Sequence, residues 1–220
     1  MAGELPAEAL IQAWLSPATP TGGFAYSHGI ERAVADRRVR DAATATAWIA
    51  DLVEFGAGRA DVLLIAEAMA GDPTAAAEHA RARAASRERL AETEVQGAAL
   101  ARLASGAWDC GPGDPVPWPV ALGRAARAAG IAREAVLARA LQAFVAGLAG
   151  ACLRLVPLGQ TEGQRLQRDL VALCERVARE TAAEADAHAA HPLDAHGQSC
   201  FRGDISAMRH ETQTVRLFRS

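Results

Sequence analysis

Two pairs of neighbouring residues carry the groups that hydrolytic enzymes use. Ser27 precedes His28, and His210 precedes Glu211. A hydroxyl, an imidazole and a carboxylate supply a nucleophile or a general acid and base when their side chains meet at one reacting atom. Adjacent residues generally cannot direct both side chains at the same atom, so neither pair has usable spacing. The sequence favours a protein that is not an enzyme.

Possible metal ligands gather between residues 188 and 200. They are His188, His191, His196 and Cys200. Nitrogen and sulfur ligands suit nickel or zinc, but no two of these residues follow a strong ligand signature. A chain that holds metal itself therefore remains an alternative. Its candidate ligands are His196, Cys200 and the more distant His210.

A glycine-bearing segment, SPATPTGGFAYSHGIE, runs from Ser16 to Glu31. A glycine-rich loop that enters a helix can bind anions, because free N–H groups and the helix dipole point toward the ligand. The spacing here matches neither GxGxxG nor a Walker loop, and GxSxG is absent. These features favour a tight turn over a phosphate site.

Two further segments combine unusual residues. RLVPLGQTEGQRL, from Arg154 to Leu166, joins a helix end, a turn and a helix start, as an interhelical elbow does. DISAMRHETQTVRLFRS, from Asp204 to Ser220, is a polar terminus with a few apolar residues. Such a terminus frays unless a partner buries its apolar side chains and pairs its arginines. The second segment predicts an extended tail that orders on another protein.

The basic residues exclude several mechanisms. All 23 are arginine, and the chain has no lysine. A Walker A loop and Schiff-base chemistry both require lysine, so any nucleotide energy must come from a partner. The net charge is −3 and the arginines are scattered, whereas nucleic-acid binders concentrate basic residues on one face. Nucleic acid is not an expected ligand.

The apolar segments predict a protein of the cytoplasm without a membrane span. Glu4 and Glu8 stand where a signal peptide has basic residues. The longest apolar run, Ala143 to Leu153, meets Arg154 before the roughly 18 residues that a span needs.

The composition predicts an all-α fold. About a quarter of the residues are alanine, the strongest intrinsic helix former, whereas β-branched and aromatic residues are sparse. We expect a single-domain bundle of roughly eight to ten helices over residues 1–203 and an extended tail over residues 204–220. The expected helices are Ala7–Leu15, Ser27–Val39, Asp41–Gly58, Arg59–Ala70, a stretch from Ala75 to Ala107 in which Ser86 can cap a break, Val120–Ala129, Arg133–Leu155, and a last helix from Thr161 to about Ala189.

Side-chain spacing adds detail to this pattern. Asp41 suits an N-cap, and Thr161 with Gln164 suits a capping box. Two stripes should be buried: Trp48, Leu52 and Phe55 in one helix, and Leu137, Leu141, Phe144, Leu148, Cys152 and Leu155 in another. The small residues Ala143, Gly147 and Ala151 allow a close helix contact, either within the chain or in a two-fold dimer.

The glycine-bearing segment, the elbow and the C-terminus occur together, and in this order they resemble a known family. The urease accessory protein F family (UreF) carries SPxxPxGxFxYSxGxE, RLVPLGQTxGQR and MRHETQxxRLFRS. This resemblance spans the chain from the first helix to Ser220 and implies an all-helical homodimer without enzymatic activity. It further implies that the chain bridges a D-type (also called H-type) accessory protein to a G-type GTPase. That assembly delivers nickel into apo-urease with GTP, so the chain needs no cofactor of its own.

The resemblance also suggests which residues bind partners. We expect Met208 to Ser220 to dock on the D-type protein, with Leu217 and Phe218 as apolar anchors. The charged groups of this tail are Arg209, His210, Glu211, Arg216 and Arg219. Tyr26, Ser27 and Glu31 are expected to contact the GTPase or the path of the metal.

Overall fold

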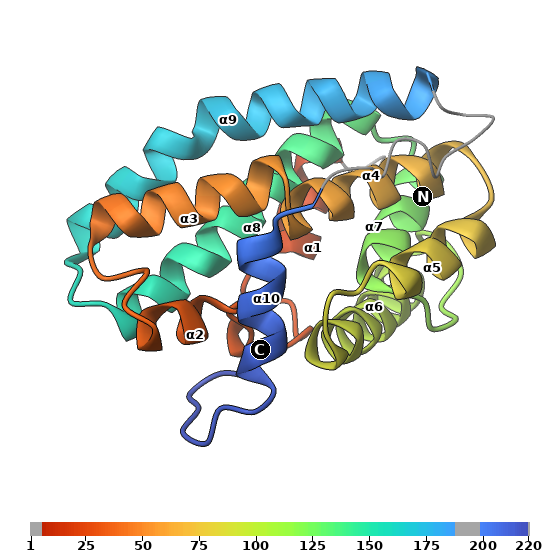
Figure 1. Cartoon of the computed structure of the whole chain (residues 1–220). Helices are drawn as coiled ribbons and strands as arrows, with labels where there is room; N and C mark the ends of the chain where they lie inside the picture. The colour runs from red at the N-terminus through yellow and green to blue at the C-terminus, as the bar shows by residue number, and fades with distance from the viewer. Residues whose placement is uncertain (1–5, 188–198, 220) are drawn as a thin grey trace.

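The structure is a computed structural model that describes residues 6–187 and 199–219 (Figure 1). Its described residues form an all-α body without a strand. The α-helices are α1 (Ala7–Leu15), α2 (Ile30–Ala35), α3 (Ala42–Glu54), α4 (Ala57–Ala70), α5 (Pro73–Ala82), α6 (Arg87–Trp108), α7 (Trp118–Ala128), α8 (Arg133–Leu155), α9 (Gln160–Ala187) and α10 (Phe201–His210), and a 3-10 turn, η1, covers Gly23–Ala25.

Local sequence patterns predicted several helix boundaries correctly. α1 and α8 have the predicted bounds. Asp41 caps α3, because its carboxylate accepts the Thr44 N–H at 2.8 Å and the Asp41 N–H donates in return to the Thr44 hydroxyl. Ser86 ends the long helix-forming stretch, since its hydroxyl accepts the Arg89 N–H and opens α6.

α8 packs most extensively against α9, and it also contacts α4, α3, α2 and α1 (Figure 1). Its predicted stripe is confirmed, because Leu137, Leu141, Leu148 and Cys152 are buried in the core and Phe144 packs against it. By length and composition alone, α8 could cross a membrane, but 56% of its most apolar window is buried inside this body. A central core helix has the same properties.

Other predicted boundaries were wrong, for physical reasons. The helix expected over Ser27–Val39 is only Ile30–Ala35, because Gly29 and Arg37 have positive φ values on either side of it. The start of α9 does not use Thr161 and Gln164. Instead, the Glu162 carboxylate accepts the Gly159 N–H at 2.8 Å. Phe55 ends α3 and is half-exposed.

The C-terminus differs most from expectation. Residues 204–210 belong to α10, so the predicted boundary between residues 203 and 204 falls inside a helix. α10 packs across α2 and α6, and the chain then turns back beneath it (Figure 1). The prediction of an extended tail is therefore wrong in this structure: the C-terminus is part of the body.

Candidate functional site

α10 makes a close backbone contact with the body at Gly29. This glycine has φ of +77°, and a Cβ placed on it would lie 2.6 Å from the Ala207 backbone nitrogen. The Ser206 hydroxyl donates a hydrogen bond to the Gly29 carbonyl at 2.9 Å. Only glycine satisfies both the backbone angle and the contact, so Gly29 allows α10 to rest directly on the start of α2.

Glu31 holds the segment that returns to the body after α10. Its carboxylate accepts the Leu217 N–H at 2.6 Å and the Phe218 N–H at 2.9 Å. The Glu31 N–H in turn donates to the Ser27 hydroxyl at 3.3 Å, and both residues are buried. Two backbone donors that would otherwise lose hydrogen bonds are therefore satisfied by one buried carboxylate.

His210 joins this carboxylate to α6. The ring is fully buried, with Nε2 3.1 Å from Glu31 and Nδ1 2.7 Å from Glu88. Because an ionised carboxylate only accepts hydrogen bonds, two such partners require an N–H on each ring nitrogen. The arrangement therefore suits an imidazolium between two carboxylates, and Glu88 also pairs with Arg216 at 2.6 Å.

Arg154, in the elbow segment, completes the junction. Its Nη2 donates to the Phe24 carbonyl at 3.0 Å, and its guanidinium lies 4.3 Å from the ring centroid of Phe218. The Arg219 N–H donates to the Ala25 carbonyl at 2.8 Å. The three segments that the sequence singled out thus meet in one place, which we call the C-terminal junction: Phe24, Ala25, Gly29, Glu31, Glu88, Arg154, His210, Arg216 and Phe218.

The junction contains several residues that were predicted to contact partners. Phe218, expected to anchor on another protein, is 4% exposed and packs within its own chain. His210, Tyr26, Ser27 and Glu31 are also buried. In this conformation Glu31 and His210 contact each other across the junction, and the assignment of these residues to partner contacts stays a prediction.

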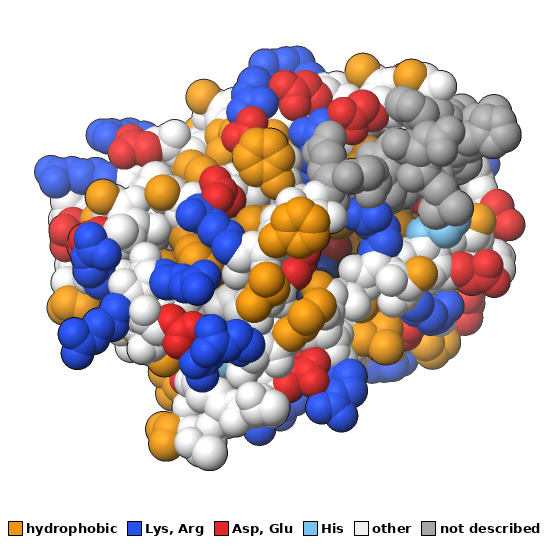
Figure 2. Space-filling model, in the orientation of Figure 1, with side chains coloured by type: hydrophobic (Ala, Val, Ile, Leu, Met, Phe, Trp, Pro, Cys, Tyr) orange, Lys and Arg blue, Asp and Glu red, His pale blue; other side chains and the backbone are white. Residues whose placement is uncertain are grey.

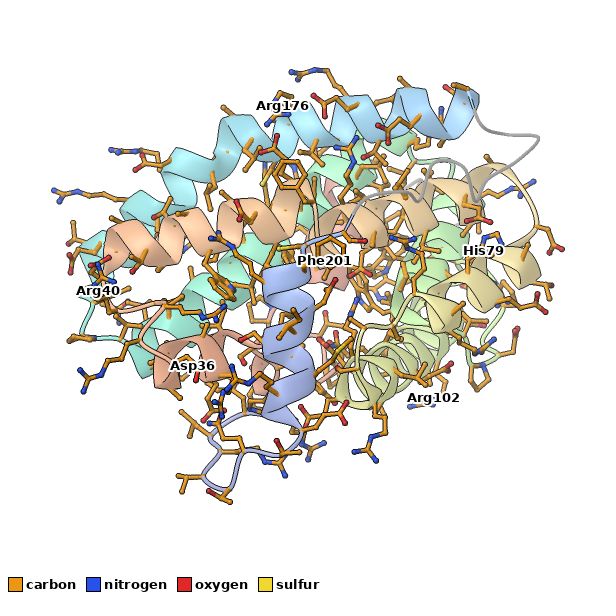
Figure 3. The ribbon with its side chains drawn as sticks, in the orientation of Figure 1. Asp36, Arg40, His79, Arg102, Arg176 and Phe201 are labelled. Carbon is orange, nitrogen blue, oxygen red and sulfur yellow. The ribbon has the colours of Figure 1, made fainter. Side chains whose placement is uncertain are left out.

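Two other charged groups of the C-terminus have partners within the chain. Arg209 pairs with Asp36 at 3.1 Å, and Glu211 pairs with Arg87 at 2.8 Å. Asp36 lies on the end of α2 beside the lower part of α10 (Figure 3). The side chains of Arg209 and Arg216 nevertheless remain about half-exposed, and Arg219 is exposed. These arginines can still meet a partner.

The outward face of α10 carries a row of exposed apolar side chains. Phe201 is 74% exposed, and Ile205 and Met208 are each 50% exposed. Their spacings of four and three residues place them on one face, which we call the α10 ridge. Figure 2 shows apolar side chains gathered in the middle of this face, and Figure 3 marks Phe201 at the start of the helix. Val215 and Leu217, nearer the terminus, are also exposed apolar side chains.

A second buried polar network joins the glycine-bearing segment to α6 and α4. His28 Nε2 is 3.2 Å from Glu92, Arg89 bonds both Glu92 and Asp61, and the His28 ring meets Phe144 edge-on. Burial alone would raise the pKa of Glu92, but the neighbouring His28 and Arg89 lower it to about 2. This network fixes the end of the glycine-bearing segment against α6.

The two residue pairs considered for catalysis do not form catalytic sites. The Ser27 hydroxyl faces Glu31, whereas His28 faces Glu92. His210 points into the junction, and Glu211 turns outward to Arg87. Neither pair directs two groups at a common reacting atom, because neighbouring side chains leave the backbone in different directions.

The metal alternative gains no support from the described part of the chain. Over residues 6–187 and 199–219, no group of three or more histidine, cysteine, aspartate or glutamate side chains is placed to hold a metal ion. Cys200 is buried, and burial raises the pKa of its thiol. His196, together with His188 and His191, lies outside the described residues.

Several residues of the junction and the ridge were not predicted. Glu88 lies in a charged first helical turn, a pattern typical of a solvated face. Phe201 and Ile205 were not assigned to the contact surface. The i, i+4, i+7 spacing of Phe201, Ile205 and Met208 was a readable signal for the ridge. No local pattern signalled Glu88, because its partners are more than a hundred residues away.

Comparisons with known proteins show the family to which the chain belongs. The model of the UreF family matches residues 39–171, which is more than half of the chain. The chain is 54% identical over 208 residues to the urease accessory protein UreF of Cereibacter sphaeroides, covering 94% of this chain and 95% of that protein. The chain belongs to the UreF family. The UreF of Methylobacterium radiotolerans is 45% identical over 235 residues, covering 98% of this chain and 99% of that protein.

The names of UreF-family relatives indicate what kind of protein acts together with them. The UreF of Dinoroseobacter shibae is 42% identical over 208 residues, covering 94% of this chain and 95% of that protein, and carries the same name, urease accessory protein. An accessory protein of urease acts together with urease and other accessory proteins. Exposed apolar and arginine side chains at one end of a UreF-family chain are therefore candidates for such contacts.

The pKa of Glu31 predicts how acid affects the junction. Burial raises this pKa, but the hydrogen bonds from Leu217 and Phe218 and the contact with His210 outweigh burial and lower it below its usual value of 4.5. A lowered pKa means that the stabilisation is complete above the unfolded-state value and is lost as the pH falls through the folded-state value.

We therefore expect the free energy of unfolding to fall more steeply with acid in the wild type than in Glu31→Gln, below about pH 4.5. Chemical denaturation between about pH 7 and pH 3 measures both slopes. The difference between the two proteins isolates Glu31 from other acid-sensitive groups. Parallel curves would contradict the assignment of Glu31 as an ionised holder of the C-terminus.

Proposed function

We propose that this chain is a non-catalytic assembly factor of urease maturation. In this proposal it bridges the D/H-type accessory protein and the G-type GTPase in the cytoplasm, and the complex inserts nickel into apo-urease with GTP. The observation that carries the proposal is the α10 ridge, whose apolar side chains are exposed on a helix fixed by the C-terminal junction. A fixed apolar face costs little conformational entropy on binding, which favours tight association.

Charge supports a protein partner at this surface. Residues 199–219 carry Arg202, Arg209, Arg216 and Arg219 against the carboxylates of Asp204 and Glu211. The C-terminal element is thus locally basic on a chain whose net charge is −3. An apolar surface with an acidic rim would be complementary to it. We assign this surface to the D/H-type protein.

In this proposal the partner proteins, and not this chain, bind the nucleotide and the metal. The absence of lysine removes the Walker A mechanism from this chain, so the GTPase must bind and hydrolyse GTP. We propose that nickel is held by the partner complex and that this chain positions the proteins that pass it on.

Homodimer formation is part of the same proposal. A Cβ added to Gly147 or Gly150 on α8 would meet no atom within 4 Å among the described residues. Gly147 is exposed, so this part of the small-residue row is not used for packing inside the chain. Two copies could approach closely over it, because small side chains permit short helix–helix distances.

Reconstitution tests the proposed function. The chain is co-expressed with D/H-type and G-type accessory proteins and apo-urease, and complexes are separated by size exclusion. Urease activity is then measured after addition of nickel, bicarbonate and GTP. We expect a complex containing all three accessory proteins and activation that depends on this chain. Equal activation without the chain, or stoichiometric nickel binding by the isolated chain, would contradict the proposal.

A further inference from the structure

A second feature of the surface lies away from the α10 ridge. It is a cleft of about 760 Å³ between α4, α5, α7 and the loop that joins α6 to α7. α5 and α7 stand together on the right of the bundle in Figure 1. The volume lies within the roughly 300–1,000 Å³ of small-molecule sites. None of its lining residues belongs to the C-terminal junction or to α10.

The walls of this cleft are apolar and firmly held. Pro112, Pro115 and Val116 line one side, and Pro73 and Ala77 line the other. Proline fixes the backbone angle φ, so little ordering is needed when a ligand binds.

The loop wall is anchored on α6 and α7. A Cβ on Gly97 would lie 2.0 Å from the Val116 carbonyl oxygen, so the loop crosses α6 in direct backbone contact. Asp114 holds Arg124 through two hydrogen bonds of 2.9 and 2.7 Å. These contacts hold the loop in place, and Ala68 and Ala128 contribute only small side chains to the lining of the cleft.

Three arginines line the cleft, and only two of them have a carboxylate partner among the described residues. Arg124 is matched by Asp114, and Arg81 uses its Nε to bind Glu94 at 2.6 Å. Arg127 donates to the Gly71 carbonyl at 3.3 Å and has no carboxylate within ion-pair distance among the described residues. The cleft therefore has more positive than negative charge, and Arg127 retains N–H groups that could bind a ligand.

We propose that this cleft binds a small organic anion, with a phosphate or carboxylate group on Arg127 and Arg81 and an apolar portion against the proline-bearing walls. Guanidinium groups match both kinds of oxyanion through paired, charge-assisted hydrogen bonds. The apolar walls select ligands with a hydrocarbon or ring portion over inorganic ions. This site goes beyond the proposed assembly role and does not depend on it.

Calorimetric titration of the full chain tests the proposal at constant ionic strength. The probes are phenyl phosphate and phenylacetate, which share an aromatic ring but differ in the anion, and inorganic phosphate. We expect saturable binding of at least one aromatic probe, and the tighter of the two identifies the preferred anion. Inorganic phosphate should bind at least tenfold more weakly than phenyl phosphate, because it lacks the apolar portion.

Matched arginine variants show where the probe binds. Arg127→Gln should weaken binding about tenfold, and the double variant Arg81→Gln/Arg127→Gln should abolish it. Arg102 is an exposed arginine on α6 outside the cleft (Figure 3), so Arg102→Gln should bind as the wild type does. The proposal is overturned if neither aromatic probe binds, if inorganic phosphate binds equally well, or if Arg127→Gln and Arg102→Gln behave alike while thermal unfolding shows both folded.

Discussion

Replacing Glu31 with alanine is expected to release residues 211–219 from the body while the remaining helices stay folded. The Glu31 carboxylate accepts the Leu217 and Phe218 N–H groups and faces the buried His210 ring. A hydrogen bond to a charged group contributes about 1.5–3 kcal/mol, so losing two costs the docked state on the order of 3–6 kcal/mol. The imidazole would also lose one of its two carboxylate neighbours.

Amide hydrogen exchange measures this release directly. The Leu217 and Phe218 amides should exchange roughly a hundredfold faster or more in Glu31→Ala, because each 1.4 kcal/mol corresponds to about a tenfold change in the opening equilibrium. Glu31→Gln keeps one acceptor oxygen but introduces an NH2 group, so its exchange should be intermediate. Trypsin should cut after Arg216 sooner in both variants.

A matched control separates this effect from a general loss of acidic charge. Glu134 is exposed in the first turn of α8 and has no ion pair among the described residues. Glu134→Gln should leave exchange at Leu217 and Phe218 unchanged. Equal exchange in Glu31→Ala and the wild type would mean that other contacts, such as Arg154 on Phe218, hold the terminus alone.

The sequence predicted the helices better than the junction, and the reason is physical. Helix starts depend on residues three or four positions apart, so Asp41 and Ser86 could be assigned from local spacing. The buried stripe of α8 could be assigned because apolar periodicity reports which face is covered. α2 was overextended because positive φ at Gly29 and Arg37 is not visible in a hydrophobic pattern.

The junction combines residue types that are usually exposed. Glu31, Glu88 and His210 are charged or ionisable, and a single sequence gives no sign that they meet across more than a hundred residues. Burial of such groups is tolerated only when each has partners, and those partners are supplied by tertiary structure. The resemblance of three segments to one family was informative because it grouped residues that the fold brings together.

The terminus was predicted to be extended for a related reason. A polar segment with four arginines between residues 199 and 219 has too few apolar residues to predict burial. In the structure, backbone hydrogen bonds to Glu31 and the ring of Phe218 under Arg154 fix it instead. Phe218 is thereby buried inside the chain, and the exposed side chains of the terminus are the ones available to a partner in this conformation.

Placing an arginine on the α10 ridge is expected to prevent assembly without unfolding the chain. Ile205 and Met208 are half-exposed, so Ile205→Arg or Met208→Arg adds no buried charge to the isolated protein. Each apolar side chain contributes about 1.5–3 kcal/mol when it is covered by a partner. A charge in its place must also be desolvated, so we expect affinity for the D/H-type protein to fall roughly a hundredfold or more.

Val171 on α9 supplies the matched control, because it is also a half-exposed apolar residue on a helix but lies away from the ridge. Val171→Arg should retain assembly and urease activation, whereas Ile205→Arg should lose both while its thermal unfolding matches that of the wild type.

Comparison with Glu31→Ala then separates two requirements. If the ridge must be held in place as well as exposed, Glu31→Ala will also weaken assembly, although it leaves every ridge side chain intact. If Glu31→Ala assembles normally and Ile205→Arg does not, α10 alone makes the contact and the terminal residues 211–219 are dispensable. Normal assembly of both variants would place the partner contact elsewhere on the chain.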